Sequence, residues 1–295
     1  MQGSEWSLIA FTLLTQISVG GFIILSVFNR RYLSKVREED VKPAKVKALV
    51  LLTGLALLAL IVSFLHLGNP INAIYALNNL PSSWLSREIL FVSLFVAAMV
   101  VLTFSYIRSI GPVWLYNVLS LVAVVSGILG VFSMSKVYML ETIPVWNSIT
   151  TPIQFFLSAF LLGGLVVLLA GVLNPGYRKP DLKVPDYTKA IVEALIIMLI
   201  LLLASLILWI VNVYLLSGGG LAEEKSLFIL MSENSLFFYL RIVLMAVSIL
   251  LIIYRLFSRS FLRMKSFLVI LFILVLMAEV MGRYLFYVSY IRIGI

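Results

Sequence analysis

The 295-residue chain is 62% hydrophobic and only 12% charged. No soluble domain of this length carries such a balance, so lipid must solvate much of the surface. The absence of cysteine excludes disulfides, thiolate metal sites and ligation of an iron–sulfur cluster by this chain. The net charge of +9 could suggest nucleic-acid binding. The distribution of the basic residues between the loops, described below, indicates instead that they determine the orientation of the protein in the membrane.

Eight long apolar runs follow one another along the sequence. A bilayer core about 30 Å thick takes roughly 20 apolar residues per helix, and the runs cover residues 6–28, 47–67, 85–107, 113–135, 149–173, 189–216, 235–257 and 266–290. They are too long and too uniform for membrane β-strands, which alternate over about ten residues. We therefore predict an all-α, polytopic membrane protein: one integral-membrane domain, 1–295, with eight transmembrane helices. The start, "MQGSEWSLIAFTLL", has no basic n-region, so the first run is expected to be a retained helix.

The basic residues are distributed unequally between the connecting loops. The loops after the first, third, fifth and seventh runs contain 16 of the 22 Lys and Arg residues. The positive-inside rule assigns these loops to the cytoplasm, which accounts for the net charge without nucleic acid. Both termini are then expected outside a prokaryotic plasma (inner) membrane.

Three ionisable residues of the last two runs lie within the membrane near the outer face. At 1.5 Å per residue, Glu279 lies about 20 Å and Arg283 about 26 Å along the outward-running last helix, and Arg241 is about 9 Å deep in the seventh. Ionisable groups inside a membrane are costly and are functional hypotheses by default. Glu279 and Arg283 are four residues apart and can pair, so a structural pair is an equal alternative. For Arg241, packing or partner docking is also open.

Three further charged residues have simpler expected roles. Lys136 and Glu141 follow the fourth run and are expected in a solvated outer loop. Glu193 lies near the inner end of the sixth run, where it can snorkel or pair with Lys189.

The segment between the second and third runs contains helix signals. Asn69 can cap a helix and Pro70 suits its first position. Apolar residues then recur at helical spacing, which predicts a short interfacial helix ending near residues 79–81. Ser82 or Ser83 is expected to cap the third long helix.

His66, the only histidine, ends the second run at the outer face, and Glu88 lies about one turn inside the third helix. A base and a carboxylate at the rim of an apolar crevice can accept the two protons that a buried quinol loses on oxidation, and an ordinary histidine titrates at about 6.5. One histidine cannot supply both axial ligands of a b-type haem, and His/Met ligation is disfavoured, so neither haem nor metal is expected.

Six ordered blocks carry a resemblance to a known family. "FTLLTQISVGGFI", "FLHLGNP", "LSREI", "IPVWNSITTPIQFF", "RIVL" and "AEVMGRYLFY" resemble the DmsC family, the membrane anchor subunits of dimethyl sulfoxide reductase and related iron–sulfur molybdoenzymes. The resemblance implies an eight-helix, haem-free subunit that oxidises menaquinol to menaquinone. It also implies partners on the outer face: a four-cluster iron–sulfur subunit and a molybdopterin catalytic subunit.

The resemblance assigns the family's quinol-site histidine to His66 and its acidic partner to Glu88. Family members can carry a base two positions after the proline of the His-Leu-Gly-x-Pro motif, where this chain has Asn72, and Arg87 is a candidate replacement. Residues expected to support the site or dock the partner are Arg87, Asn69, Asn72, Arg241, Glu279 and Arg283.

The expected function is a menaquinol-oxidising anchor without a redox centre of its own, and three alternatives stay open. The same anchor could run in reverse and reduce quinone within a sulfur-compound-oxidising complex. A purely structural anchor would bind no quinol. A secondary transporter would need a midplane site at broken helices, and no matching breaks are apparent in the two halves of the sequence.

Overall fold

The computed structural model describes residues 3–33, 38–64, 73–173, 187–258 and 264–293. Within these ranges, eight helices are long and apolar enough to cross a membrane. They are α1 (Gly3–Phe28), α2 (Glu38–Phe64), α4 (Trp84–Arg108), α5 (Val113–Tyr138), α6 (Thr150–Leu173), α7 (Tyr187–Ser217), α9 (Ser235–Ser258) and α10 (Met264–Val288). The predicted all-α, polytopic membrane fold is therefore confirmed.

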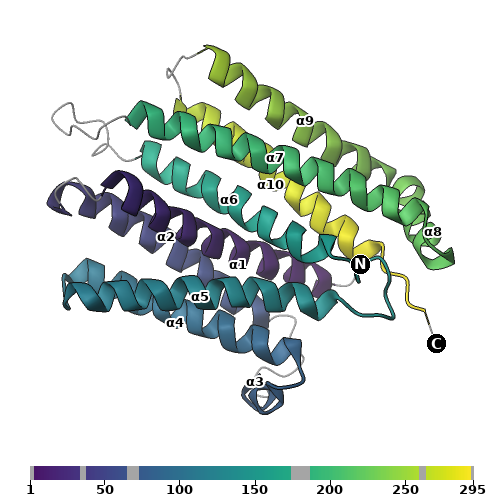
Figure 1. Ribbon diagram of the computed structural model, residues 1–295, viewed down its shortest axis with the longest axis horizontal. Helices are drawn as coiled ribbons and strands as arrows, with labels where there is room; N and C mark the ends of the chain where they lie inside the picture. The colour runs from purple at the N-terminus through teal and green to yellow at the C-terminus, as the bar shows by residue number, and fades with distance from the viewer. Residues whose placement is uncertain (1–2, 34–37, 65–72, 174–186, 259–263, 294–295) are drawn as a thin grey trace.

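The eight long helices run side by side along the bundle (Figure 1). The N-terminus and the C-terminus lie at the same end of this bundle. We call this the terminal end, where α1 begins and α10 ends, and the opposite one the far end. Two short helical segments lie at the terminal end: α3 (Ala73–Ala76) with η3 (Leu77–Asn79), and α8 (Leu221–Phe228) with η5 (Ile229–Glu233). That the terminal end faces the outside of the membrane stays a prediction.

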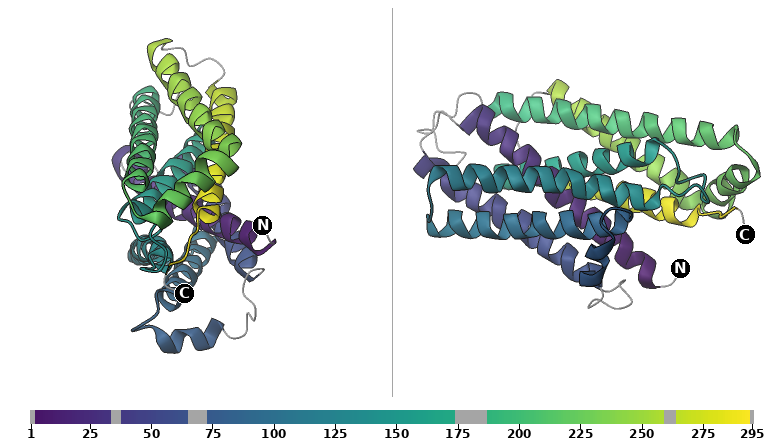
Figure 2. Two further views of the ribbon diagram at one scale, coloured as in Figure 1. Left: turned by 90° about the vertical axis from the view of Figure 1, so that its right-hand side faces the viewer. Right: turned by 60° about the horizontal axis from the view of Figure 1, so that its bottom comes forward.

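Helix α1 is the most enclosed of the eight spans. It packs extensively against α6 and α2, while α4 pairs with α5 and α9 with α10. Figure 2 shows the α4–α5 pair and the α9–α10 pair on opposite sides of the α1–α6 centre. A helix at the centre of a membrane bundle can present polar groups to its neighbours, and the buried residues of α1 include Thr12, Thr15, Gln16 and Ser18.

Two glycines allow α1 and α6 to cross at very short range. A Cβ on Gly20 would collide with the backbone carbonyl of Ala159, and a Cβ on Gly163 would lie 2.6 Å from the carbonyl carbon of Gly20 and 2.9 Å from Cα of Gly21. Small residues are the usual means by which membrane helices bring their backbones together. This crossing fixes how the inner faces of α1 and α6 are presented to α10.

The segment before α4 agrees with the sequence prediction. Residues 73–79 are helical, and Ser83 rather than Ser82 caps α4, because the backbone N–H of Ser86 donates to Ser83 Oγ at 3.2 Å. The predicted start of the interfacial helix at Asn69 and Pro70 lies outside the described residues.

Several boundaries differ from the prediction for reasons that hydropathy does not detect. Helix α2 begins at Glu38 instead of residue 47, because the helix continues as a charged segment beyond its apolar part. Helix α8 follows a Gly-rich turn and lies outside the eight predicted apolar runs. It begins where the Glu223 carboxylate accepts a hydrogen bond from the Gly220 N–H at 3.1 Å, which is a helix N-terminal capping interaction.

Candidate functional site

The predicted site residues divide into those that the structure describes and those that it does not. His66, Asn69 and Asn72 lie outside the described residues. Glu88 and Arg87 lie in the first turns of α4, as predicted. Arg241, Glu279 and Arg283 are all buried in the half of the bundle nearer the terminal end.

Arg87 holds the turn that leads into α4. Its Nε donates to the carbonyl of Leu80 at 2.9 Å, and its Nη2 donates to the carbonyl of Pro81. The guanidinium also lies over the ring of Trp84, 4.2 Å from its centroid, at a distance typical of a cation–π interaction. Arg87 thus supports the connection between the short α3–η3 segment and the helix that carries Glu88.

Glu88 points into the bundle rather than to its surface. Its side chain is only 7% exposed, and its carboxylate interacts electrostatically with the hydroxyls of Tyr138 and Tyr287. These two tyrosines end α5 and α10, and the hydroxyl of Tyr287 donates to that of Tyr138 at 2.8 Å. A buried carboxylate and a hydrogen-bonded pair of phenols, from three helices, therefore lie in the same region near the terminal end.

An aromatic cluster surrounds the tyrosine pair. The Tyr138 ring contacts Trp146, Phe155, Phe286 and Tyr287, with centroids 5.5–5.9 Å apart. Trp146 belongs to the loop between α5 and α6, and its indole N–H donates to the carbonyl of Phe286 at 2.7 Å. The block "IPVWNSITTPIQFF", which forms the α5–α6 loop and the start of α6, thus contacts the end of α10 through Trp146.

Arg283 turns toward α1 and α6. Its Nη2 donates to Gln16 Oε1 at 3.1 Å, and its guanidinium lies over the ring of Phe155, 3.8 Å from the centroid. Gln16 belongs to α1 and Phe155 to α6, so one buried arginine contacts both central helices and the aromatic cluster. A desolvated cation–π contact of this kind contributes about 2 kcal/mol.

The direct pair of Glu279 with Arg283, one of the two alternatives that the sequence left open, does not form. Among the described side chains, no ion pair within 4.0 Å involves either residue. Glu279 Oε2 instead accepts a hydrogen bond from the hydroxyl of Ser158, while its Oε1 is buried without a hydrogen-bond partner. Spacing of four residues allows a pair on one helix face, but α1 and α6 offer Arg283 a closer amide and ring.

Arg241 completes this cluster from α9. It is 6% exposed and lies over Trp209 at 5.4 Å. A Cβ on Gly282 would lie 2.8 Å from both Nε and Nη2 of Arg241, so the missing side chain of that glycine makes room for the guanidinium. Burial against α10 and α7 leaves Arg241 a packing and electrostatic role, because a partner at the surface could not reach it.

The structure differs from the prediction for two of the three remaining charged residues. Lys136 lies in the last turn of α5, half-buried with its ammonium 5.8 Å from the Trp84 ring centroid, rather than in a loop. Glu141 is exposed in the following loop, as predicted. Glu193 pairs with Arg31 at 3.1 Å instead of with Lys189, because η1 (Asn29–Leu33) brings that arginine to the start of α7.

Sequence reasoning missed the uncharged members of the network: Gln16, Tyr138, Trp146, Ser158 and Tyr287. Tyrosine and tryptophan near a helix end are typical of the membrane interface, so nothing in their pattern separates them from interfacial residues. The available signal was the density of aromatic residues in the last quoted block, "AEVMGRYLFY". Among the described residues, no group of three or more His, Asp or Glu side chains is placed to hold a metal ion.

The sequence is similar to that of known membrane anchor subunits. Residues 1–288 match the family model described as "DMSO reductase anchor subunit (DmsC)". The protein is 35% identical over 174 residues to the C subunit of anaerobic dimethyl sulfoxide reductase from Escherichia coli K12, an alignment of 57% of this sequence and 59% of that one. It is 32% identical over 181 residues to the corresponding C subunit of Haemophilus influenzae, covering 61% and 62%, and 30% identical over 175 residues to the E. coli anaerobic dimethyl sulfoxide reductase subunit YnfH, covering 58% of each. These alignments span about three fifths of each relative, whereas the family model spans nearly the whole sequence, which therefore belongs to the DmsC family of DMSO reductase anchor subunits.

Proposed function

We propose that the protein anchors a dimethyl sulfoxide reductase-type complex in a prokaryotic plasma membrane and oxidises menaquinol there without a haem. Membership of the family and the eight long apolar helices support the anchoring role. The partners in this proposal are a four-cluster iron–sulfur subunit and a molybdopterin catalytic subunit, docked at the terminal end over α3 and α4. Electrons pass from quinol to the nearest cluster of the iron–sulfur subunit.

The observation that supports quinol oxidation best is the buried carboxylate of Glu88 beside the Tyr138–Tyr287 hydroxyl pair. Oxidation of a quinol removes two electrons and two protons, one proton from each ring hydroxyl. A basic group within hydrogen-bond reach can accept such a proton, and this type of assistance accelerates proton transfer by about 10²–10⁴-fold. In the proposal, Glu88 accepts one proton and His66 the other.

The neighbouring residues suit a flat aromatic ligand. Trp84, Tyr138 and Trp146 provide aromatic surface near the end of the bundle, and apolar sites with a few convergent polar groups are typical of small-molecule binding. Arg283 and Gln16 lie one layer deeper and fix the positions of Phe155 and Phe286 below the tyrosines. Protons released from Glu88 leave at the terminal end, the same end as the electrons, so little charge would cross the membrane.

The proposal is tested in membranes that contain the whole complex. We expect Glu88→Gln and His66→Ala to reduce menaquinol-dependent reduction of the terminal acceptor by at least about 10²-fold. Activity with a soluble reductant that delivers electrons directly to the partner subunits should be unchanged, because assembly is intact. Glu141→Gln is the matched control, since it neutralises an exposed carboxylate near the same end.

Two results would contradict the proposal. Full menaquinol oxidation by either variant would remove the assigned proton acceptor. A failure of the unaltered complex to bind a quinol analogue saturably would leave a purely structural anchor. Supplying reduced partner subunits and menaquinone to the same membranes measures the reverse reaction and so determines the direction of electron flow.

A further inference from the structure

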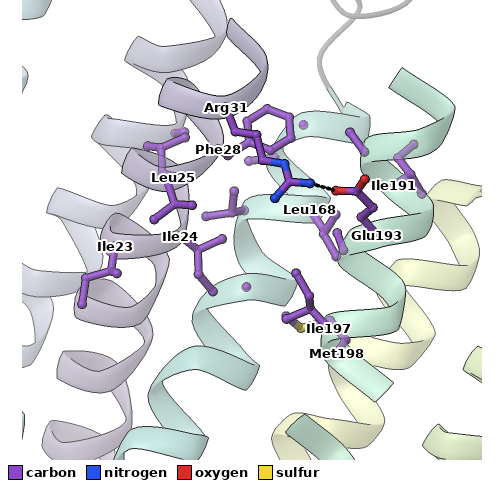
Figure 3. A pocket seen from close by; sticks show the side chains of 18 of the residues that line it. Ile23, Ile24, Leu25, Phe28, Arg31, Leu168, Ile191, Glu193, Ile197 and Met198 are labelled. Atoms are coloured by element: carbon purple, nitrogen blue, oxygen red, sulfur yellow. Dashed lines mark ion pairs between the residues drawn. The ribbon is translucent and has the colours of Figure 1, made fainter. Parts of the chain in front are cut away.

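A large apolar cavity lies at the far end of the bundle, away from Glu88. It has a volume of about 340 Å³ and is formed by α1, α6 and α7, with part of α2. Figure 3 shows Arg31 and Glu193 facing each other across its mouth, and Ile24, Ile197 and Met198 deeper inside. Apart from Arg31 and Glu193, every residue that lines the cavity is apolar.

We propose that this cavity binds an acyl tail of an anionic phospholipid whose phosphate contacts Arg31. The inference is independent of quinol oxidation and concerns the opposite end of the molecule. A quinone ring inside the cavity would find no hydrogen-bond donor or acceptor below the mouth, whereas an acyl tail needs none. A lipid also places its charge and its apolar tail at the two positions where the cavity offers a cation and an apolar wall.

The depth of the cavity fits one leaflet. Its lining runs from Arg31 on η1 to Ile23 on α1, and from Ala190 to Met198 on α7. Eight residue steps correspond to about 12 Å at 1.5 Å per residue. Half of a hydrocarbon core about 30 Å thick is about 15 Å, so the cavity follows an acyl tail through most of one leaflet.

The cavity is accessible both from the lipid and from the membrane surface. Val27 and Ile197 line it while 60% and 52% exposed, so it opens sideways between α1 and α7. At the mouth, the side chain of Arg31 is 65% exposed and that of Glu193 29% exposed, so the guanidinium can bind a phosphate while it keeps its carboxylate partner.

The charge around the mouth favours an anion. Among the side chains that the structure describes there, Arg30, Lys47 and Lys189 are exposed on the segments that border the cavity, and Glu193 is the carboxylate in its lining. Basic pockets between transmembrane helices bind anionic lipid headgroups, and each Lys or Arg near the surface contributes about 1 kcal/mol, or about fivefold in affinity.

Two pairs of variants separate the apolar contribution to lipid binding from the ionic contribution. Gly171 lines the cavity, and a Cβ there would have no atom within 4 Å, so Gly171→Leu fills open space without a collision. Gly54→Leu is its control, because Gly54 has equally open surroundings on α2 but does not line the cavity. Arg31→Gln removes the charge at the mouth, and Arg30→Gln removes an adjacent charge that does not line it.

The test is native mass spectrometry of the purified full-length protein, titrated with dioleoylphosphatidylglycerol or with dioleoylphosphatidylcholine, which has the same acyl tails and no net charge. We expect one phosphatidylglycerol to bind saturably and more tightly than phosphatidylcholine. Gly171→Leu should weaken binding of both lipids at least about tenfold, and Arg31→Gln should weaken only phosphatidylglycerol, by about fivefold. Gly54→Leu should bind both lipids as the unaltered protein does, and Arg30→Gln should weaken phosphatidylglycerol binding less than Arg31→Gln does, because Arg30 does not line the cavity.

Three results would overturn the inference. The first is unchanged phosphatidylglycerol binding in Gly171→Leu, and the second is an equal effect of Arg31→Gln and Arg30→Gln. The third is one-for-one displacement of the lipid by a menaquinone analogue whose own binding does not depend on Arg31, which would make this a quinone site. If Gly171→Leu does not fold, Arg31→Gln still decides the outcome, because it changes only an exposed residue.

Discussion

The crossing of α1 and α6 leads to a quantitative prediction for Gly163→Ala. The new Cβ would lie 2.6 Å from the carbonyl carbon of Gly20, whereas ordinary contact begins at 3.4 Å. The backbone nitrogen of Gly21 lies closer still, so the helices must separate by more than 0.8 Å (3.4 against 2.6 Å), and the atoms involved belong to the backbone and cannot rotate away. Overpacking of a close contact costs about 1–3 kcal/mol, and we expect the upper end of that range.

Gly171→Ala is the matched control on the same helix. A Cβ at Gly171 meets no atom within 4 Å, so only the intrinsic helix preference of alanine over glycine changes, by up to about 1 kcal/mol in favour of folding. Because Gly163→Ala gains the same preference, the difference between the two variants isolates the collision. We expect Gly163→Ala to be less stable than Gly171→Ala by about 3 kcal/mol.

The measurement is equilibrium unfolding of the purified protein in mixed micelles with increasing SDS, followed by tryptophan fluorescence. The two free energies of unfolding are compared at the same SDS fraction. If Gly163→Ala is as stable as Gly171→Ala, the backbones of α1 and α6 do not approach as closely as described, and the reasoning is wrong.

We make three further predictions for variants of residues near the terminal end. Ser83→Ala removes the α4 cap and should lower the free energy of unfolding by about 1 kcal/mol, measured by the same SDS titration. Tyr287→Phe removes a hydroxyl–hydroxyl hydrogen bond, and we expect a loss of about 1 kcal/mol with slower menaquinol oxidation, whereas the exposed Tyr290→Phe should change neither quantity. Arg283→Met removes the hydrogen bond to Gln16 and the cation–π contact with Phe155, and should cost about 3–5 kcal/mol: about 1–3 for the buried amide oxygen left unpaired and about 2 for the cation–π contact. The exposed Arg292→Met should leave the unfolding curve unchanged.

Hydropathy predicted the spans well because each is a single apolar run bounded by polar residues. Helices α5 and α9 begin at Val113 and Ser235, as predicted. Helix α8 was missed because it is short and contains Glu223, Glu224 and Lys225, so it lacks the property by which membrane spans are found. The apolar content of a segment indicates lipid contact but not helical structure outside the lipid.

The sequence indicated the charged residues of the candidate site but not the uncharged residues that surround them. Glu88, Arg241, Glu279 and Arg283 were identified because a charge within an apolar run is detectable from one segment alone, and all four are buried. Their contacts come from other helices, and spacing along one helix contains no information about them. The same limit applies to Tyr138, whose role depends on the ends of three helices meeting.

The hydrogen bond between Gln16 and Arg283 has a consequence for the order of events during synthesis. The two residues are 267 positions apart. At about 5–20 residues per second, α1 is complete roughly 13–53 s before its arginine partner on α10 has been made. Throughout that interval the amide of Gln16 lies in a membrane that offers it no partner from α10. Helix α1 thus gains its buried arginine contact only after α10 has been made, so this part of the bundle is completed late in synthesis.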